Sequence, residues 1–346
     1  MLSAKPIKLA ANQFDHFYKG GNKIGKLRKG PGGPYRPEEW IGSTTTRFGA
    51  SEQGLTILED GTTLRASIRT NPESWLGKAH VNKYGDSIEL LVKLLDPDQR
   101  LPVHFHPNRA FAKQHLGLAH GKTEAWIILE APKDAWVGVG FENKMSMSSV
   151  KEMVEKENSK ALINSLNKRT VQAGDGILVP AGIPHAIAEG IFILELQEPT
   201  DLSILLEWED FAVDGKKDGH LNLGFDLALQ ALNFEALEQK DLDKLIVSTK
   251  DSNNLLTSML PVQAEPYFRS HLIKPKNATI EMAAGFAILL IIEGSGVLQT
   301  EKQGDLNIEK GDAILVPFDA GIWSVTGNVE VLLSRPPAPD APMTSL

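Results

Sequence analysis

The sequence predicts a mainly β protein with helices, in which two jelly-roll-like β-barrels are accompanied by a helical part. Short apolar segments alternate with Gly- and Pro-containing turns over much of the chain, which is the rhythm of antiparallel sandwiches and barrels. Residues 171–196 and 308–333 both read G-D-x-I-L-V-P followed by a turn and two apolar segments. A repeated β unit of this kind indicates two related barrels in one chain.

The expected elements follow in chain order. Residues 16–50 are rich in Gly, Lys and Pro and predict loops and short strands, whereas residues 61–80 predict one or two short helices. The apolar run 88–95 is bounded by turn residues and predicts a buried strand. The remaining expectations are strands at 102–107, 124–131 and 135–141 with a loop between the first two, a helical segment at 145–167 capped by Ser146 or Ser148, strands over 171–201, a helical segment at 221–246, and short strands over 267–335.

These elements predict three parts of the chain. Residues 1–140 and 171–215 form the first barrel, and residues 141–170 and 216–260 supply helical segments packed on it. Residues 261–346 form a second, degenerate barrel. The first copy of the repeat contains His185, whereas the second has Gly321 or a neighbour at that place. We therefore expect metal ligands in the first barrel and none in the second.

The composition excludes several classes of function. A net charge of −8 over 346 residues argues against a nucleic-acid surface, and the absence of cysteine excludes disulfides, thiolate metal sites and thiol nucleophiles. Residues 1–21 contain no apolar stretch of signal-peptide length, and the apolar runs at 88–95 and 286–292 are too short to span a bilayer. We expect a cytoplasmic protein that contacts neither membrane nor nucleic acid and acts as a monomer or homodimer.

The strongest functional signal is a cluster of histidines between residues 101 and 131, which contain four of the nine in the chain. His104 and His106 are two residues apart, so on a strand they point to the same face with about 6–7 Å between their backbone positions. Glu124 lies on the next predicted strand, and His185 lies in the turn P-A-G-I-P-H. Three imidazoles and one carboxylate suit one Zn²⁺ per chain, and they also suit Mn²⁺, Fe²⁺, Co²⁺ or Ni²⁺.

An isolated H-x-H pair is more often a surface or core feature, and this remains the alternative interpretation. The downstream Lys122–Glu124 segment and the P-A-G-x-P-H turn make a chance grouping much less favoured. His115 and His120 lie in the predicted loop between the two strands. We assign both to the substrate side of the site, with a merely solvated position as the alternative. The remaining histidines with no partner motif, for which we expect structural roles only, include His16, His80 and His271.

The combination of H-x-H, a downstream Glu and G-D-x-x-x-x-P-x-G-x-x-H resembles the cupin pattern of metal-binding β-barrels. More narrowly, the chain resembles the type I mannose-6-phosphate isomerase family of the short bacterial kind. The matching segments are 38–46, 89–107, 121–131, 171–201 and the degenerate barrel at 286–333. The resemblance implies a zinc-dependent aldose–ketose isomerase that interconverts mannose 6-phosphate and fructose 6-phosphate through an enediol. It also implies four metal ligands, namely His104, His106, Glu124 and His185, with His104 where the family usually has Gln.

Two departures from the family concern the phosphate group of the substrate. Pro102 stands where the family has a Ser, and residues 202–220 contain no Arg where the family has one. Lys93 and Lys122 match family lysines and are expected to bind the substrate, and Lys216 and Lys217 are weak candidates for the missing charge. An unphosphorylated or other sugar is therefore the alternative substrate, and a non-catalytic sugar-binding protein is the alternative from a different class. A dioxygenase with Fe²⁺ is disfavoured by the isomerase-like segments.

Isomerisation through an enediol needs a base near two adjacent carbons and a cation for the developing oxyanion. Glu195 lies in F-I-L-E-L-Q, which matches the family's E-x-Q segment, and is the predicted catalytic base. Its alternative role is that of a barrel residue in a salt bridge. Lys122 is the second predicted catalytic residue, as a clamp on the substrate.

Overall fold

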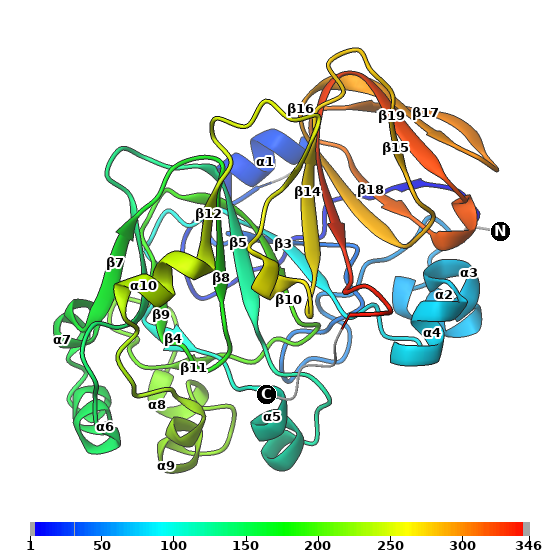
Figure 1. Cartoon of the computed structure of the whole chain (residues 1–346). Coiled ribbons are helices and arrows are strands. Elements are labelled where there is room, and N and C mark those ends of the chain that lie inside the picture. Colours follow the sequence, from blue (N-terminus) through cyan, green and yellow to red (C-terminus); the bar gives the residue numbers. More distant parts are fainter. Residues whose placement is uncertain (1–3, 31, 342–346) are drawn as a thin grey trace.

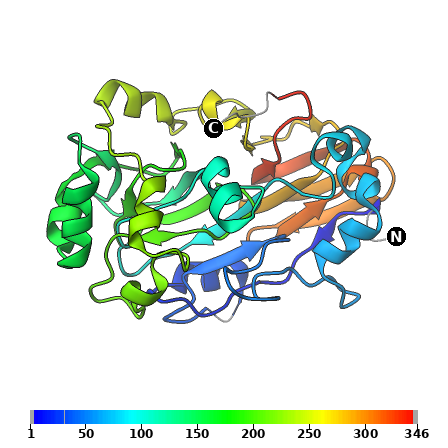
Figure 2. The ribbon, with the colours of Figure 1, turned by 90° about the horizontal axis from the view of Figure 1, so that it is seen from below.

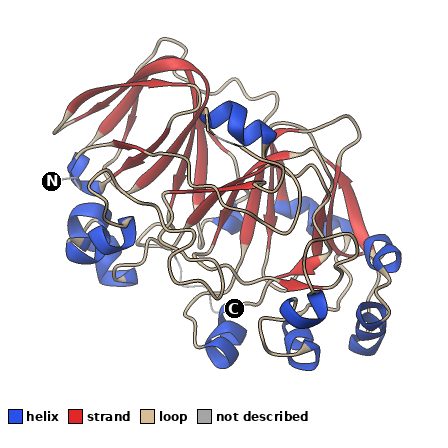
Figure 3. Ribbon diagram, turned by 180° about the vertical axis from the view of Figure 1, so that it is seen from behind, coloured by secondary structure: helices blue, strands red, loops and turns tan. Residues whose placement is uncertain are grey.

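Two groups of strands lie side by side in the computed structural model, which describes residues 4–30 and 32–341 (Figure 1). The helices lie around the outside of the strands (Figure 3). Seen from below, the helices α6 and α7 are at one end of the molecule and α2 to α4 are at the other (Figure 2). The prediction of a mainly β protein with helices is thereby confirmed.

The first group of strands consists of two antiparallel sheets. The six-stranded sheet has the order β12-β8-β5-β10-β3-β2, with the bounds Ile246–Ser248, Asp175–Val179, Glu124–Glu130, Phe192–Gln197, Leu91–Leu95 and Glu38–Ile41. The five-stranded sheet has the order β11-β4-β9-β6-β7, with the bounds Ile204–Leu205, His104–Phe105, His185–Ile187, Trp136–Phe141 and Leu166–Thr170. Buried side chains of both sheets, among them Trp126 and Val139, form one apolar cluster between them.

The second group is a single eight-stranded sheet that contains two long strands. The order β1-β18-β16-β19-β14-β13 has the bounds Ile7–Lys8, Ala313–Val316, Ala287–Thr300, Trp323–Arg335, Arg269–Ile273 and Leu256–Ser258, while β15 (Ile280–Met282) pairs with β19 and β17 (Gly304–Glu309) with β16. The register between β16 and β19 shifts between Ile291 and Glu293, and such an irregularity lets a long strand bend. A second apolar cluster, which includes Trp323 and Leu289, fills this barrel.

The two barrels share a third apolar cluster. It joins residues of the six-stranded sheet, such as Ile127 and Leu196, to residues of the eight-stranded sheet, such as Ile288 and Leu332. The N-terminal strand β1 also pairs with β18 of the second barrel. The predicted domain boundaries remain a prediction. Residues 7–8, which were assigned to the first barrel, are nevertheless hydrogen-bonded to the second barrel.

The helices are short. Their bounds are α1 Asn22–Arg28, α2 Leu64–Thr70, α3 Pro72–Leu76, α4 Lys78–Tyr84, α5 Arg109–Leu116, α6 Met147–Glu155, α7 Ser159–Asn164, α8 Gly215–Asp218, α9 Phe225–Ala228 and α10 Gln239–Leu242, with 3₁₀ turns at Leu229–Ala231, Asp243–Leu245, Val262–Ala264 and Phe318–Ala320. The helices predicted at 61–80 are present as α2 to α4. The Ser146 hydroxyl caps α6 by accepting a hydrogen bond from Ser149 N, as one of the two predicted caps. Among the described residues, no helix has the length and apolar character needed to cross a bilayer.

Two sequence expectations about helices were wrong. The predicted loop between 107 and 124 contains α5, whose start is capped by Asn108 and which ends at Gly117 in a left-handed conformation. The helical segment predicted at 221–246 is broken into single turns. Its backbone bonds instead to the first barrel, because Asn233 N donates to Gly182 O at 2.8 Å and Leu237 N donates to Phe141 O at 2.9 Å. These tertiary hydrogen bonds replace the ones that a continuous helix would have made.

Candidate metal centre and its cavity

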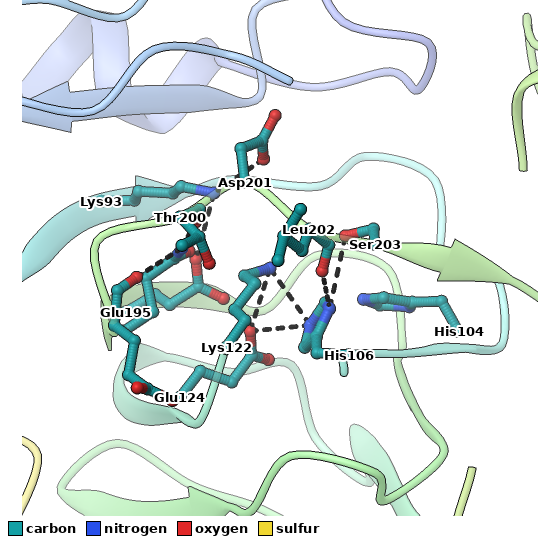
Figure 4. A network of polar contacts seen from close by, with 12 residues as sticks. Lys93, His104, His106, Lys122, Glu124, Glu195, Thr200, Asp201, Leu202 and Ser203 are labelled. Atoms are coloured by element: carbon teal, nitrogen blue, oxygen red, sulfur yellow. Dashed lines mark hydrogen bonds and ion pairs between the residues drawn. The ribbon is translucent and has the colours of Figure 1, made fainter. Parts of the chain in front are cut away.

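The three predicted histidine ligands meet inside the first barrel. His104 on β4 and His185 on β9 are register partners in adjacent antiparallel strands, and their Nε2 atoms lie 3.0 Å apart. His106 follows β4 and points to the same side as His104 (Figure 4), as the i, i+2 rule requires. One ring nitrogen from each histidine lies within 4.8 Å of the other two, and all three residues are buried. They form a buried group that can hold a metal ion.

Each imidazole is held in one orientation by a backbone carbonyl. The Nδ1–O distances are 2.8 Å from His104 to Pro102, 2.6 Å from His106 to Leu202 and 2.8 Å from His185 to Ile183. Because a carbonyl only accepts, the hydrogen of each neutral ring sits on Nδ1 and the Nε2 lone pair is left for a ligand. The Nε2 atoms of all three rings therefore carry a lone pair on the side of the same small space, where that of His106 lies 3.1 Å from Lys122 Nζ.

Burial also keeps these rings neutral. It lowers the pKa of His106 and of His185 to about 3, and the pKa of His104 lies well below its usual value. A neutral imidazole is the form that binds a metal. No proton has to leave these rings at neutral pH before a cation binds.

Glu124, at the start of β5, supplies a carboxylate next to the histidines. Its Oε2 lies 2.9 Å from His106 Nε2 and 3.2 Å from Lys122 Nζ, while its Oε1 accepts a hydrogen bond of 2.9 Å from Trp126 Nε1. Burial alone would raise the pKa of Glu124, but the ammonium group of Lys122 holds it well below its usual value. Oε2 is buried without a well-formed hydrogen bond, so it is available to a cation.

The chemistry of this donor set fits a divalent metal. Three imidazole nitrogens and one carboxylate oxygen are the ligands that Zn²⁺ and its first-row neighbours accept. The Nδ1 hydrogen bonds of the three histidines and the Trp126 hydrogen bond to Glu124 orient the ligands, as hydrogen bonds behind the ligands do in protein metal sites.

A cavity of about 560 Å³ opens beside this group. His104 and Lys122 belong to its wall, together with Lys93 and Glu195 from the neighbouring strands β3 and β10. Its volume is in the range of about 300–1,000 Å³ that small-molecule sites occupy. The predicted metal group, the predicted base and two predicted substrate-binding lysines are therefore brought to one space.

Lys93 lies at the centre of a buried charged cluster. Its Nζ is 3.4 Å from Glu38 Oε2, 3.6 Å from Glu195 Oε2 and 3.9 Å from Asp201 Oδ1, and it lies over the Trp40 ring at 4.7 Å. Burial opposes the charge of Lys93, but Glu38 and then Glu195 raise its pKa above the usual value. Lys93 is therefore a fully paired cation, held by the protein's own carboxylates.

Glu195 titrates near neutrality in this surrounding. Burial is the largest cause that raises its pKa, and the negative charge of Glu124 is the next. Lys93 and Lys122 lower the pKa, which comes to about 7. A carboxyl group with a pKa close to the working pH can both take and return a proton.

The remaining predicted residues lie elsewhere. His115 is on α5, where its ring packs at 4.5 Å from that of Phe111. His120 lies 2.8 Å from Glu89 Oε1. Neither belongs to the wall of the cavity, and their contact with substrate stays a prediction. Lys216 pairs with Glu157 at the surface, also away from the wall.

Among the wall residues that the sequence analysis did not assign to the site are His16 and Arg47. His16, for which only a structural role was expected, lies 3.5 Å from Glu38. It sits in an extended segment with no motif around it, so no sequence signal could have found it. Arg47 also lines the cavity, in the T-T-T-R-F-G segment, and its only signal was a positive charge close to the matched segment 38–46.

The chain is similar to known mannose-6-phosphate isomerases. A family model described as the mannose-6-phosphate isomerase cupin domain matches residues 262–336. Mannose-6-phosphate isomerase ManA of Bacillus subtilis is 27% identical over 83% of this chain and 87% of its own length. Mannose-6-phosphate isomerase of Streptococcus mutans is 27% identical over 96% of this chain and 98% of its own.

Solved structures share the fold. The mannose 6-phosphate isomerase of Bacillus subtilis has a TM-score of 0.75 at 22% identity, over 95% of this chain and 99% of that one. A mannose 6-phosphate isomerase bound with zinc and yttrium has a TM-score of 0.70 at 15% identity, over 96% of this chain and 99% of that one. The two-barrel architecture, the matched second barrel and the curated relatives agree. These findings support a mannose-6-phosphate isomerase of the type I cupin kind, because the curated relatives match most of the chain and the family model matches its second barrel.

Proposed function

We propose that this isomerase is metal-dependent and interconverts a sugar phosphate such as mannose 6-phosphate and fructose 6-phosphate through an enediol. The observation that carries the proposal is the placing of Glu195, with a pKa of about 7, in the wall of the same cavity as His104 and Lys122. This arrangement puts a proton acceptor and a cation-binding group on one substrate-sized space. The substrates of the curated relatives support the choice of sugar.

Each residue has a part in the proposed reaction. A divalent cation held by His104, His106, Glu124 and His185 would supply positive charge for the oxyanion that develops on the substrate. The Glu195 carboxylate takes a proton from one carbon and returns it to the adjacent carbon. Because Glu195 is only 4% exposed, the proton is shielded from bulk water while the carboxyl group holds it.

Lys122 is the proposed clamp on the substrate. Its Nζ lies 3.1 Å from His106 Nε2 and 3.2 Å from Glu124 Oε2, and the residue also lines the cavity. An ammonium group in this position can donate to a hydroxyl or carbonyl oxygen of a sugar next to the metal group. Zn²⁺ is the proposed ion because the donor set suits it, and because one structural neighbour is bound with zinc.

An unphosphorylated sugar is the second candidate substrate, and a specific observation favours it. The cavity-lining residues between 202 and 220 are Ser203, Leu205, Ala212, Val213, Asp214 and Asp218. None of these is a cation, and Pro102 in the wall has no hydrogen-bond donor.

The test is to load the protein with Zn²⁺ and follow the interconversion of mannose 6-phosphate, fructose 6-phosphate, mannose and fructose. Turnover of the phosphorylated pair that is lost in His185→Ala but kept in His271→Ala supports the proposal, because His271 lies on β14 of the second barrel. Turnover of the free sugars alone supports the second candidate. If none of the four sugars is converted by the metal-loaded protein, the proposed function is wrong.

A further inference from the structure

Three cationic side chains line the cavity, and two of them are already paired. Lys93 contacts three carboxylates, and Lys122 contacts Glu124. A cation whose charge is balanced inside the protein gains less from a substrate anion, because binding must first weaken its existing pairs. The third cation, Arg47, is in a different situation.

Arg47 is a half-buried lining residue of the cavity and has no carboxylate at ion-pair distance within residues 4–30 and 32–341. Its Nη1 donates only two long hydrogen bonds to neutral oxygens, 3.3 Å to Asp15 O and 3.4 Å to Gln53 Oε1. The nearby carboxylate of Asp15 is occupied by Arg36 at 3.0 Å. The guanidinium group of Arg47 therefore keeps most of its donors and its charge free.

The backbone around Arg47 is nevertheless held firmly. Arg47 N donates to Gln53 O at 2.8 Å, and Arg47 O accepts from Ala50 N at 2.9 Å. The next residue, Phe48, donates its N–H to Asp201 Oδ2 at 3.0 Å. Asp201 is itself a wall residue of the cavity. The loop thus presents a free guanidinium to the cavity from a fixed backbone position, and preorganisation of this kind lowers the entropic cost of binding.

We propose that Arg47 binds the anionic group of the substrate and makes the site selective for a phosphorylated sugar. This inference rests on the proposed function and names the residue that replaces the arginine missing from 202–220. The planar guanidinium matches a phosphate group with two parallel hydrogen bonds, which a lysine cannot make. Because Arg47 is half-buried, such a charge-assisted contact is screened less than at an open surface.

The test compares the binding of mannitol 6-phosphate and mannitol, which have no carbonyl and cannot be isomerised. Isothermal calorimetry on the zinc-loaded full chain should give tighter binding of the phosphate, and Arg47→Ala should weaken it by about 10- to 100-fold. Mannitol binding should stay within about twofold, which serves as an internal check that the variant is folded. Arg47→Lys should retain part of the selectivity, because the lysine keeps the positive charge but cannot make two parallel hydrogen bonds to the phosphate.

Lys216→Ala is the matched control, since it removes one positive charge from a surface residue paired with Glu157. If Lys216→Ala reduces the selectivity as much as Arg47→Ala does, the effect is one of net charge and the inference is wrong. It is equally wrong if the wild-type protein does not distinguish the two ligands, or if Arg47→Ala leaves the preference intact. Selective phosphate binding that depends on Arg47, in a protein without isomerase activity, would support this inference while contradicting the proposed function.

Discussion

His104 and His185 face each other across two paired strands, and their Nε2 atoms lie 3.0 Å apart. Each ring already donates its Nδ1 hydrogen to a backbone carbonyl, so two lone pairs point into the same gap. Two unshared lone pairs at this distance repel each other, and a cation between them removes the repulsion. A cation between these two nitrogens would therefore stabilise the folded state.

Removal of the metal should therefore lower the melting temperature. At a free Zn²⁺ concentration of 100 times Kd, binding contributes about 2.7 kcal/mol to the free energy of unfolding. We expect a strong chelator to abolish this stabilisation and added Zn²⁺ to restore it, as measured by differential scanning calorimetry. In His185→Ala the chelator should have little effect, whereas His271→Ala should respond as the wild type does. Equal responses in all three proteins would contradict the assigned ligands.

Trp126→Phe should weaken metal binding although Trp126 is not a ligand. The substitution removes the Nε1 donor that holds Glu124 Oε1 at 2.9 Å and keeps most of the ring volume. Loss of such a supporting hydrogen bond lowers metal affinity by about 10- to 100-fold. Competition with a chromophoric chelator measures the change. The control is Trp136→Phe on β6, for which we expect the wild-type affinity; a similar loss in that variant would refute the role of the Trp126 bond.

Glu195→Gln should remove activity while leaving the metal content unchanged. Loss of a general base lowers kcat by about 10²- to 10⁴-fold, and zinc content by mass spectrometry should stay at the wild-type level. The exposed Glu293, paired with Lys310 on the second barrel, provides the control substitution Glu293→Gln, which should be silent. If Glu195→Gln keeps full activity, the base is a different residue.

The pH dependence of the wild type follows from the same group. The reacting form of Glu195 is the carboxylate, and its pKa is about 7. As pH falls below about 7 the carboxyl group becomes protonated, so kcat/KM should fall about tenfold per pH unit, and it should level off above that value. A profile that is flat between pH 5 and 7 would argue against a Glu195 base.

Lys93→Met should destabilise the protein strongly. The substitution leaves Glu38, Glu195 and Asp201 without their shared cation, and breaking a buried ion pair costs about 3–5 kcal/mol. Urea unfolding measures this loss. Lys274→Met is the control, because Lys274 pairs with Glu330 in a partly exposed position where an ion pair contributes about 0–1 kcal/mol. Equal losses in the two variants would mean that Lys93 has no special structural role.

Local patterns were sufficient where the interaction was local. The i, i+2 spacing of His104 and His106 predicts side chains on one face, and the structure brings both to one point. The helix α5 could also have been predicted, since Asn108 as N-cap and Gly117 as C-cap are local signals. Predicting a loop there overlooked these signals.

Other features depend on residues that are far apart in the chain. The spacing of apolar residues over 221–246 is typical of a helix, but the backbone of this segment forms hydrogen bonds with Gly182 and Phe141 in place of those of a continuous helix. His16 and Arg47 lie outside helices and strands and still line the cavity, a position that no helix or strand period around them indicates.

The sequence by itself determined the β-rich two-barrel fold, the resemblance to a family and the residue types that make a metal centre, since strand alternation and short motifs each involve only a few neighbouring residues. Only the tertiary structure decided that Lys93 is neutralised by three carboxylates from different segments while Arg47 keeps its charge free. The physical reason is that electrostatic interactions depend on distances in space, which the order of residues along the chain does not specify.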